Sequence, residues 1–264
     1  MVTGVAAFCQ PRNPILNLTI PHFMRSLTCF FLLALTSMVH AQGEGGGARS
    51  VYLRLLSFDT QAAPDKSFAF DPKAADGTVG VEAPIKNYLN HEGTTVSLTG
   101  NSLVFSSSDK VADLKKEEFQ LASVNLPAKG QAFILIFLPV GKGKFKVLPL
   151  SDSVKDFPLG SFQMIGLSRF PIKVALENKP YEIKPGGITL VEDAPMAANG
   201  HSSMIAFAMQ NGKWERISSG LWPDPGEKRV LEIFFDNPLT QRTELKGFRD
   251  ISPLSSAEPE PTAP

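Results

Sequence analysis

The sequence predicts an all-β protein built as an antiparallel β-sandwich. From Ser50 onward, short runs rich in Val, Ile, Leu and Phe alternate with polar residues at the period of two expected of strands. Gly, Pro, Asn and Asp separate these runs at short intervals, and no ten-residue stretch repeats with a helical period. Because a parallel α/β sheet needs helices between its strands, the pattern favours antiparallel sheets packed face to face.

The sequence before residue 50 is expected to lie outside this fold. It divides into an upstream extension at 1–23, a signal peptide at 24–41 and a flexible Gly-rich lead-in at 42–49. Arg25, the apolar run 27–35 and Ala41 supply the positive region, the hydrophobic region and the cleavage site of a signal peptide. We therefore expect an exported protein, periplasmic or extracellular after cleavage near Ala41.

Export also decides what the cysteines can do. Cys9 and Cys29, the two cysteines of the chain, both precede the cleavage site, so the mature protein has no disulfide and no thiolate. The apolar run 27–35 is shorter than the roughly 20 residues that span a bilayer, and no segment after it is expected to anchor in a membrane, so no membrane span is expected in the mature chain.

The most apolar segment of the mature chain, 131–140, is predicted to be a central strand. It lacks alternation, which is typical of a strand buried on both faces. We expect one face to carry Phe133, Leu135 and Phe137 and the other to carry Ile134 and Ile136, all almost wholly buried.

Turn residues predict which strands form hairpins. Hairpins are expected around Gly100–Asn101, around 141–144 and around Asn211–Gly212, because Gly and Asn readily take positive φ. The strands between 161 and 191 are expected to form a meander. The charged stretch 109–120 fits either a short helix with Val111 and Leu114 inward or a solvated loop.

About a dozen strands exceed a single immunoglobulin-like unit. We expect two such units, 50–127 and 128–251, divided near 127–130, with one larger sandwich as the alternative. The tail 252–264, rich in Pro, Glu and Ala, is expected to be disordered.

Several short motifs in the second half of the mature chain resemble a known group. These are the segments 148–150, 156–168 and 183–187, together with Trp214. They resemble exported β-sandwich proteins of unknown function predicted in verrucomicrobial genomes. The resemblance implies an exported sandwich and supplies no catalytic residues.

The composition disfavours several classes of function. Twenty-six basic and twenty-six acidic residues leave no net charge, so a nucleic-acid partner is not expected. Two distant histidines in the mature chain, His91 and His201, and no cysteine leave no metal site, and we expect no cofactor. His201–Ser202 lacks the second Gly of a nucleophile elbow, so we expect no catalytic residue there.

Two candidate sites remain. Flat rings can stack on sugars or on partner side chains, so Trp222, Tyr181 and Trp214 are the candidate ligand-binding residues. The stronger expectation is structural, with Trp214 as the core indole of the sandwich and Trp222 as a cap on its open end. Loop carboxylates could form the acid pair of a glycoside hydrolase, drawn from Glu192, Asp193, Glu215 and Asp224.

The sequence therefore predicts a non-catalytic, exported binding or scaffold module of the cell envelope. Its partner would be an envelope protein or a polysaccharide. The alternatives are a carbohydrate-binding module that uses exposed aromatic residues and a carboxylate-based glycoside hydrolase.

Overall fold

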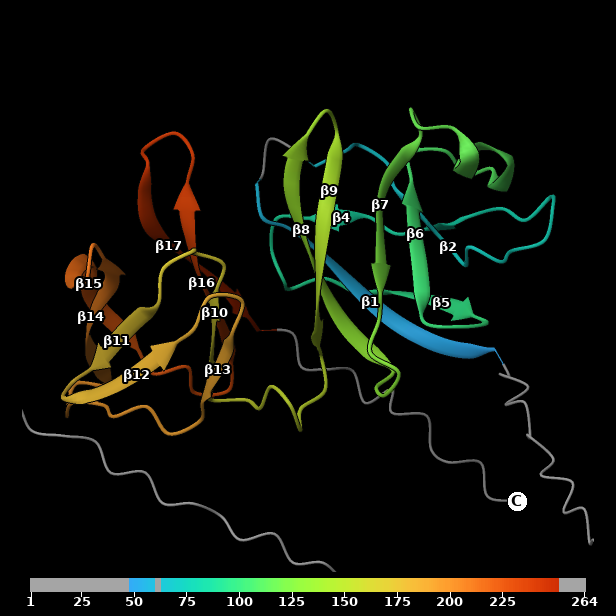
Figure 1. Ribbon diagram of the computed structural model, residues 1–264. Helices are drawn as coiled ribbons and strands as arrows, with labels where there is room; N and C mark the ends of the chain where they lie inside the picture. The colour runs from blue at the N-terminus through green and yellow to red at the C-terminus, as the bar shows by residue number, and fades with distance from the viewer. Residues whose placement is uncertain (1–47, 60–62, 252–264) are drawn as a thin grey trace, which may run out of the picture. The chain divides into compact units, whose positions relative to one another are not determined.

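The protein is all-β, as the sequence predicts. The computed structural model describes residues 48–59 and 63–251, which fall within the compact unit Glu44–Pro264 (Figure 1). The described strands are β1 Arg49–Ser57, β2 Phe68–Phe70, β3 Val81–Glu82, β4 Ile85–Lys86, β5 Thr94–Leu98, β6 Ser102–Ser106, β7 Gln120–Asn125, β8 Ala132–Gly141, β9 Lys144–Ser151, β10 Phe162–Gly166, β11 Ile172–Leu176, β12 Lys179–Ile183, β13 Ile188–Val191, β14 His201–Gln210, β15 Lys213–Pro223, β16 Arg229–Asn237 and β17 Arg242–Asp250.

The predicted terminal segments fall mostly outside the described residues. This holds for the upstream extension 1–23, the signal peptide 24–41, residues 42–47 of the lead-in and the tail 252–264. Arg49, the last residue of the expected lead-in, already belongs to β1.

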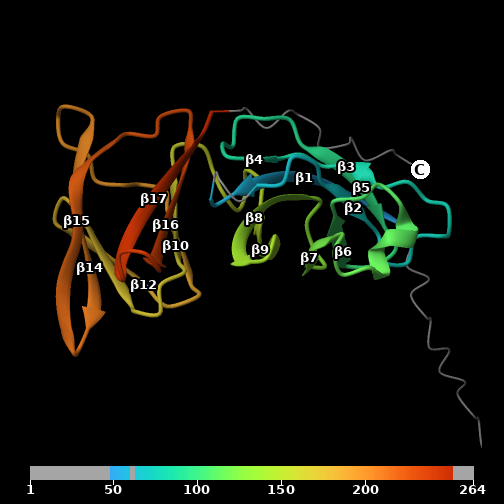
Figure 2. The same cartoon turned by 90° about the horizontal axis from the view of Figure 1, so that it is seen from above.

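The strands form four sheets, which pack as two pairs. The N-terminal sheet pair consists of the β8 sheet, ordered β4-β1-β8-β9 with β5 also on β1, and the β6 sheet, ordered β3-β2-β6-β7. The C-terminal sheet pair consists of the β16 sheet, ordered β13-β10-β16-β17, and the β14 sheet, ordered β12-β11-β14-β15 (Figure 2). Since β8 and β9 belong with β1, the expected division near 127–130 does not coincide with a boundary between sheets.

The two sheet pairs repeat one strand order. In each, the first strand (β1 or β10) runs parallel to a later one (β8 or β16), which forms a hairpin with the last (β9 or β17). The other sheets, β3-β2-β6-β7 and β12-β11-β14-β15, also correspond strand by strand. Among the described ladders, three are parallel (β1 with β4, β1 with β8 and β10 with β16), so the expected antiparallel arrangement holds for the others only.

Three apolar clusters hold the sheets together. One lies between the β8 and β6 sheets, and another lies between the β16 and β14 sheets. The third joins the outer face of the β8 sheet to the outer face of the β16 sheet and includes Leu56, Ile134, Ile136, Leu231 and Ile233. Both faces of β8 and β16 are therefore buried.

The prediction for 131–140 is confirmed. β8 lies between β1 and β9, and its residues Phe133 to Phe137 are at most 1% exposed. Phe137 and its odd-numbered neighbours belong to the N-terminal core, whereas Ile134 and Ile136 belong to the third cluster.

Some predicted connections are correct and others are wrong. Asn211 and Gly212, with φ of 50° and 76°, close the β14–β15 hairpin as predicted. The hairpin at Gly100–Asn101 does not form, because β5 pairs with β1 while β6 pairs with β2 and β7. The meander over 161–191 is also wrong apart from the β11–β12 pair, because β10 and β13 belong to the opposite sheet.

The charged stretch 109–120 contains a single turn of 3-10 helix, η1 Val111–Lys115. None of its residues is buried, so Val111 and Leu114 do not enter the core as the helical alternative expected.

A group of four buried charges, here called the buried quartet, joins the two sheet pairs. Its members are Arg54 of β1, Asp152 directly after β9, Arg229 of β16 and Asp250 of β17, none more than 2% exposed. Arg54 donates to both carboxylate oxygens of Asp152 at 2.6 and 2.7 Å and to those of Asp250 at 2.7 and 2.9 Å. Arg229 also donates to both aspartates. Each arginine thus bonds one carboxylate from each sheet pair.

The two aspartates occupy equivalent places in the repeated strand order. The amide of Asp152 donates to the carbonyl of Ala132, the first residue of β8, and Asp250 pairs with Arg229, the first residue of β16. Backbone carbonyl oxygens accept hydrogen bonds from further guanidinium N–H groups: Arg54 donates to the carbonyl of Leu89, and Arg229 donates to the carbonyl of Phe157. The quartet is therefore neutral and well bonded, as burial of charge requires.

The quartet shifts the pKa of two of its members. Burial alone would raise the pKa of Asp250, but the hydrogen bonds and charges of Arg54 and Arg229 outweigh burial and lower it. Burial alone would lower the pKa of Arg54, but its bonds to Asp250 and Asp152 outweigh that effect and raise it. Because the folded state holds Asp250 ionised, its contribution to stability is present above the usual Asp pKa and is lost in acid.

We predict that Arg54→Met lowers the free energy of unfolding by about 3–5 kcal/mol, because it leaves the two aspartates with one arginine. Urea denaturation at pH 7 measures this loss. The matched control is Arg169→Met, since Arg169 is 72% exposed in its ion pair with Asp236 and exposed pairs contribute little. Equal stability of Arg54→Met and the wild type would contradict a structural role for the quartet.

Candidate functional site

Trp222 is a core residue and cannot be an exposed binding platform. It lies in β15 rather than in a loop, is 7% exposed, and stacks on Phe162 with ring centroids 5.0 Å apart. It belongs to the C-terminal core together with Val230 and Phe234. The structural role that the sequence favoured for Trp222 therefore agrees with its position.

Tyr181 also points inward. It lies in β12, half-buried against the C-terminal core, and its ring has Lys179 Nζ at 5.4 Å. Its hydroxyl is buried, and within the described ranges it has no hydrogen-bond partner.

Trp214 is not the core indole that the sequence predicts, because it lies half-buried on the outer face of the β14 sheet. It pairs across the strands with Met209, and Lys173 Nζ lies 4.2 Å from the centre of its ring. The structure therefore does not bring Trp214, Tyr181 and Trp222 together on one surface, because the first faces outward and the other two face the core.

The outer face of the β14 sheet gathers apolar side chains that sequence reasoning missed. In β14 the buried residues Met204, Ala206 and Ala208 alternate with partly exposed ones. We call the outward set the β14 face: Ile205, Phe207, Met209, Trp214, Arg216 and Leu221. Leu221 is 64% exposed. The available signal was the run 204–209, which is apolar at both odd and even positions.

Two cations flank the aromatic centre of this face. Phe207 pairs with Lys173 on β11 and with Arg216 on β15. Lys173 is compensated by Glu182 Oε1 at 3.4 Å. Arg216 donates to Ser219 Oγ at 2.9 Å, and no carboxylate of the described residues forms an ion pair with it. The β14 face thus has an apolar centre and one uncompensated guanidinium.

The candidate catalytic groups do not converge. Glu192, Asp193, Glu215 and Asp224 are all exposed, and the one hydrogen bond found for their carboxylates within the described ranges joins Asp224 to the amide of Gly226. His201 Nδ1 bonds the carbonyl of Asn199 at 2.9 Å, whereas Ser202 faces the core. The two residues are adjacent in a strand and so project to opposite faces.

His91 lies in the loop that supplies Leu89 to the buried quartet. Its Nδ1 lies 2.8 Å from the carbonyl of Tyr88, where it donates in the neutral form. Burial and the positive charge of Arg54 lower the pKa of His91, although the bond to Tyr88 opposes this. The imidazole is therefore partly buried rather than a freely solvated loop group.

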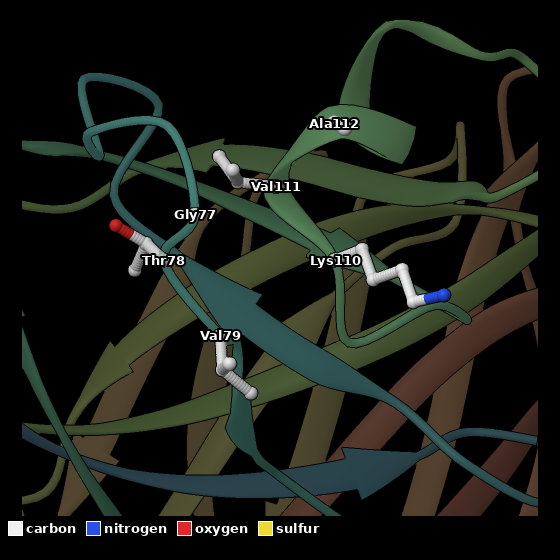
Figure 3. Close-up of a pocket in the computed structure, with 6 residues that line it drawn as sticks. All are labelled: Gly77, Thr78, Val79, Lys110, Val111 and Ala112. Atoms are coloured by element: carbon white, nitrogen blue, oxygen red, sulfur yellow. The ribbon is translucent and has the colours of Figure 1, made fainter.

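The hollows found on the surface are shallow. One of about 230 Å³ lies between the approach to β3 and η1 (Figure 3). Figure 3 shows the side chains of Thr78 and Lys110 extending away from each other, so polar groups do not converge there. A second, of about 270 Å³, lies on the outer face of the β6 sheet beside Ser102 and Asn125, which bond one another at 2.7 Å.

Two further searches cover the described part of the chain. It contains no group of three or more His, Cys, Asp or Glu residues placed to hold a metal ion. It also contains no helix whose length and apolar character would let it cross a membrane.

Comparison with known protein families finds no match, and no curated protein is significantly similar to this chain.

We predict losses of stability of different size for the two tryptophans. Trp222→Ala should lower the free energy of unfolding by about 3–5 kcal/mol, because it leaves a cavity beside Phe162. Trp214→Ala should cost about 1 kcal/mol, since it removes a partly exposed ring and its contact with Lys173. Urea denaturation of both variants tests this, and a smaller loss for Trp222→Ala than for Trp214→Ala would contradict the placement.

Proposed function

We propose that this protein is an exported, non-catalytic module of the cell envelope that binds a partner protein through the β14 face. The observation that carries the proposal is the cluster of partly exposed Ile205, Phe207, Met209, Trp214 and Leu221 on the outer side of one sheet. The signal peptide expected at 24–41 supports export.

We further propose that the two sheet pairs are two sandwich units of one type, with the boundary between β9 and β10. The repeated strand order supports this division. Each unit then has about 100 residues, the size typical of immunoglobulin-like sandwiches. The expected split near 127–130 would separate β8 from its neighbour β1, so the later boundary is preferred.

The composition of the β14 face supports a protein partner. Trp, Phe, Met and Arg are the residue types enriched at the centres of protein interfaces. A wide apolar patch at the surface of a soluble domain typically marks such an interface.

The charges of the face indicate the chemistry of that partner. No carboxylate of the described residues forms an ion pair with Arg216, whereas the nearby Lys173 is already paired with Glu182. A partner with an apolar centre and a carboxylate opposite Arg216 would bury the aromatic strip and compensate this charge.

The carbohydrate-binding alternative has less support. Trp222 and Tyr181, two of its three candidate residues, face the core. Trp214 is the remaining ring, and Lys173 Nζ already lies 4.2 Å from its centre. The hydrolase alternative would need two carboxyl groups about 5–10 Å apart in a cleft.

Site-specific cross-linking in the native envelope tests the proposal. A photoreactive benzoylphenylalanine in place of Phe207 should yield one discrete protein adduct. Excess wild-type protein should suppress that adduct, and Arg216→Glu in the same background should abolish it. The control position is Val104, an outward residue of the β6 sheet in the other sheet pair.

Two results would contradict a protein partner at this face. One is that the photoreactive residue gives the same pattern of adducts at position 104 as at position 207, or gives no adduct at either position. The other is retention of the wild type on insoluble polysaccharide that Trp214→Ala abolishes, which would favour the carbohydrate-binding alternative.

A further inference from the structure

The core of the C-terminal sheet pair contains a carboxyl group. Glu232, the fourth residue of β16, lies on the same strand face as Val230 and Phe234, which belong to that core. It is 7% exposed, and among the described residues no hydrogen bond or ion pair reaches its carboxylate. An ionised group in this position has lost most of its water without gaining a hydrogen-bond partner.

Gly247 on the neighbouring strand β17 makes room for this carboxyl group. Glu232 and Gly247 are paired across the β16–β17 ladder. A Cβ atom at position 247 would lie 2.8 Å from Oε2 and 3.0 Å from Oε1 of Glu232, closer than ordinary packing allows. The absence of a side chain at position 247 therefore leaves a slot that the carboxyl group of Glu232 fills.

The N-terminal sheet pair has an apolar residue at the equivalent place. Leu135 is the fourth residue of β8, as Glu232 is the fourth residue of β16. Leu135 pairs with Pro149, three residues before Asp152, and Glu232 pairs with Gly247, three residues before Asp250. Leu135 is wholly buried. The fold thus accepts leucine at this position, so a glutamate there is not a requirement of the fold.

Few charges act on the carboxyl group. Arg249 of β17, two residues from Gly247 on the same strand face, provides the positive charge that favours ionisation. The other titratable groups on the core side of neighbouring strands lie at exposed or half-buried positions, namely Lys179 and Tyr181 of β12 and Lys213 and Glu215 of β15. Asp236 of β16 already accepts hydrogen bonds from Ser168 and Thr243.

We propose that Glu232 is a proton-dependent switch of the C-terminal sheet pair. With a neutral carboxyl group, β16 and β17 pack closed over the slot at Gly247. With an ionised carboxylate, the charge needs water, and the β16–β17 hairpin separates more readily from the β14 sheet. This inference does not depend on which partner binds the β14 face.

The direction of the pH dependence follows from the titration. Burial raises the pKa of Glu232 to about 7, although Arg249 opposes the shift. The folded state therefore binds this proton more tightly than the unfolded chain does, and its stabilising effect is complete below pH 4.5 and disappears as the pH rises through 7. The folding equilibrium constant should fall on the order of 100-fold across this range from this group alone.

Thermal unfolding of the full chain between pH 5.5 and 8.5 tests the switch. The wild-type midpoint should fall as the pH rises, and Glu232→Gln should remove most of that fall. Glu232→Leu, which copies Leu135, should do the same. Glu215→Gln, which changes an exposed acid on β15, should keep the wild-type pH dependence.

Hydrogen exchange locates the effect. Raising the pH should reduce the protection of the β16 and β17 backbone amides against exchange in the wild type, after correction for the pH dependence of the chemical exchange rate. The protection of the β8 amides should not change. The proposal is overturned if Glu232→Gln keeps the full wild-type pH dependence, or if the loss of protection appears equally in β8.

Discussion

The buried quartet is the interaction on which the arrangement of the sheets depends. Each of its arginines bonds the aspartate of its own sheet pair and the aspartate of the other, so the two sheet pairs share the four charges. The desolvation cost of four buried charges is offset only when all four are in place. Apolar contacts such as Ile136 and Ile233 add burial around the quartet, but they are less directional and would tolerate a shifted arrangement.

The contact between the two sheet pairs determines which sheet faces remain free to bind a partner. The outer faces of the β8 and β16 sheets pack against each other and are therefore buried. The outer faces of the β6 and β14 sheets are left, and of these the β14 face carries Phe207, Trp214 and Leu221. On its other face, the β16 sheet packs against the β14 sheet and buries Glu232, where a carboxyl group is costly unless protonated.

Sequence reasoning succeeds where the signal is local and fails where it depends on distant strands. The apolar run 133–137 and the Asn211–Gly212 turn predict a buried strand and a hairpin without reference to the rest of the chain. The quartet could not be predicted in this way, because a single charge such as Arg54 within an apolar strand does not identify partners far along the chain. Trp214 and Trp222 differ by an even number of positions along β15, so their side chains would share a face in a regular strand. A bulge in the β14–β15 ladder instead turns Trp214 outward while Trp222 faces the core.

Calorimetry tests most directly whether the quartet joins the two sheet pairs into one cooperative structure. The account predicts that the wild type unfolds at pH 7 in a single transition, with a ratio of calorimetric to van't Hoff enthalpy of about 1. It also predicts that Arg54→Met unfolds in two transitions, because each sheet pair retains a core of its own. Two independent transitions in the wild type, or one unchanged transition in Arg54→Met, would contradict it.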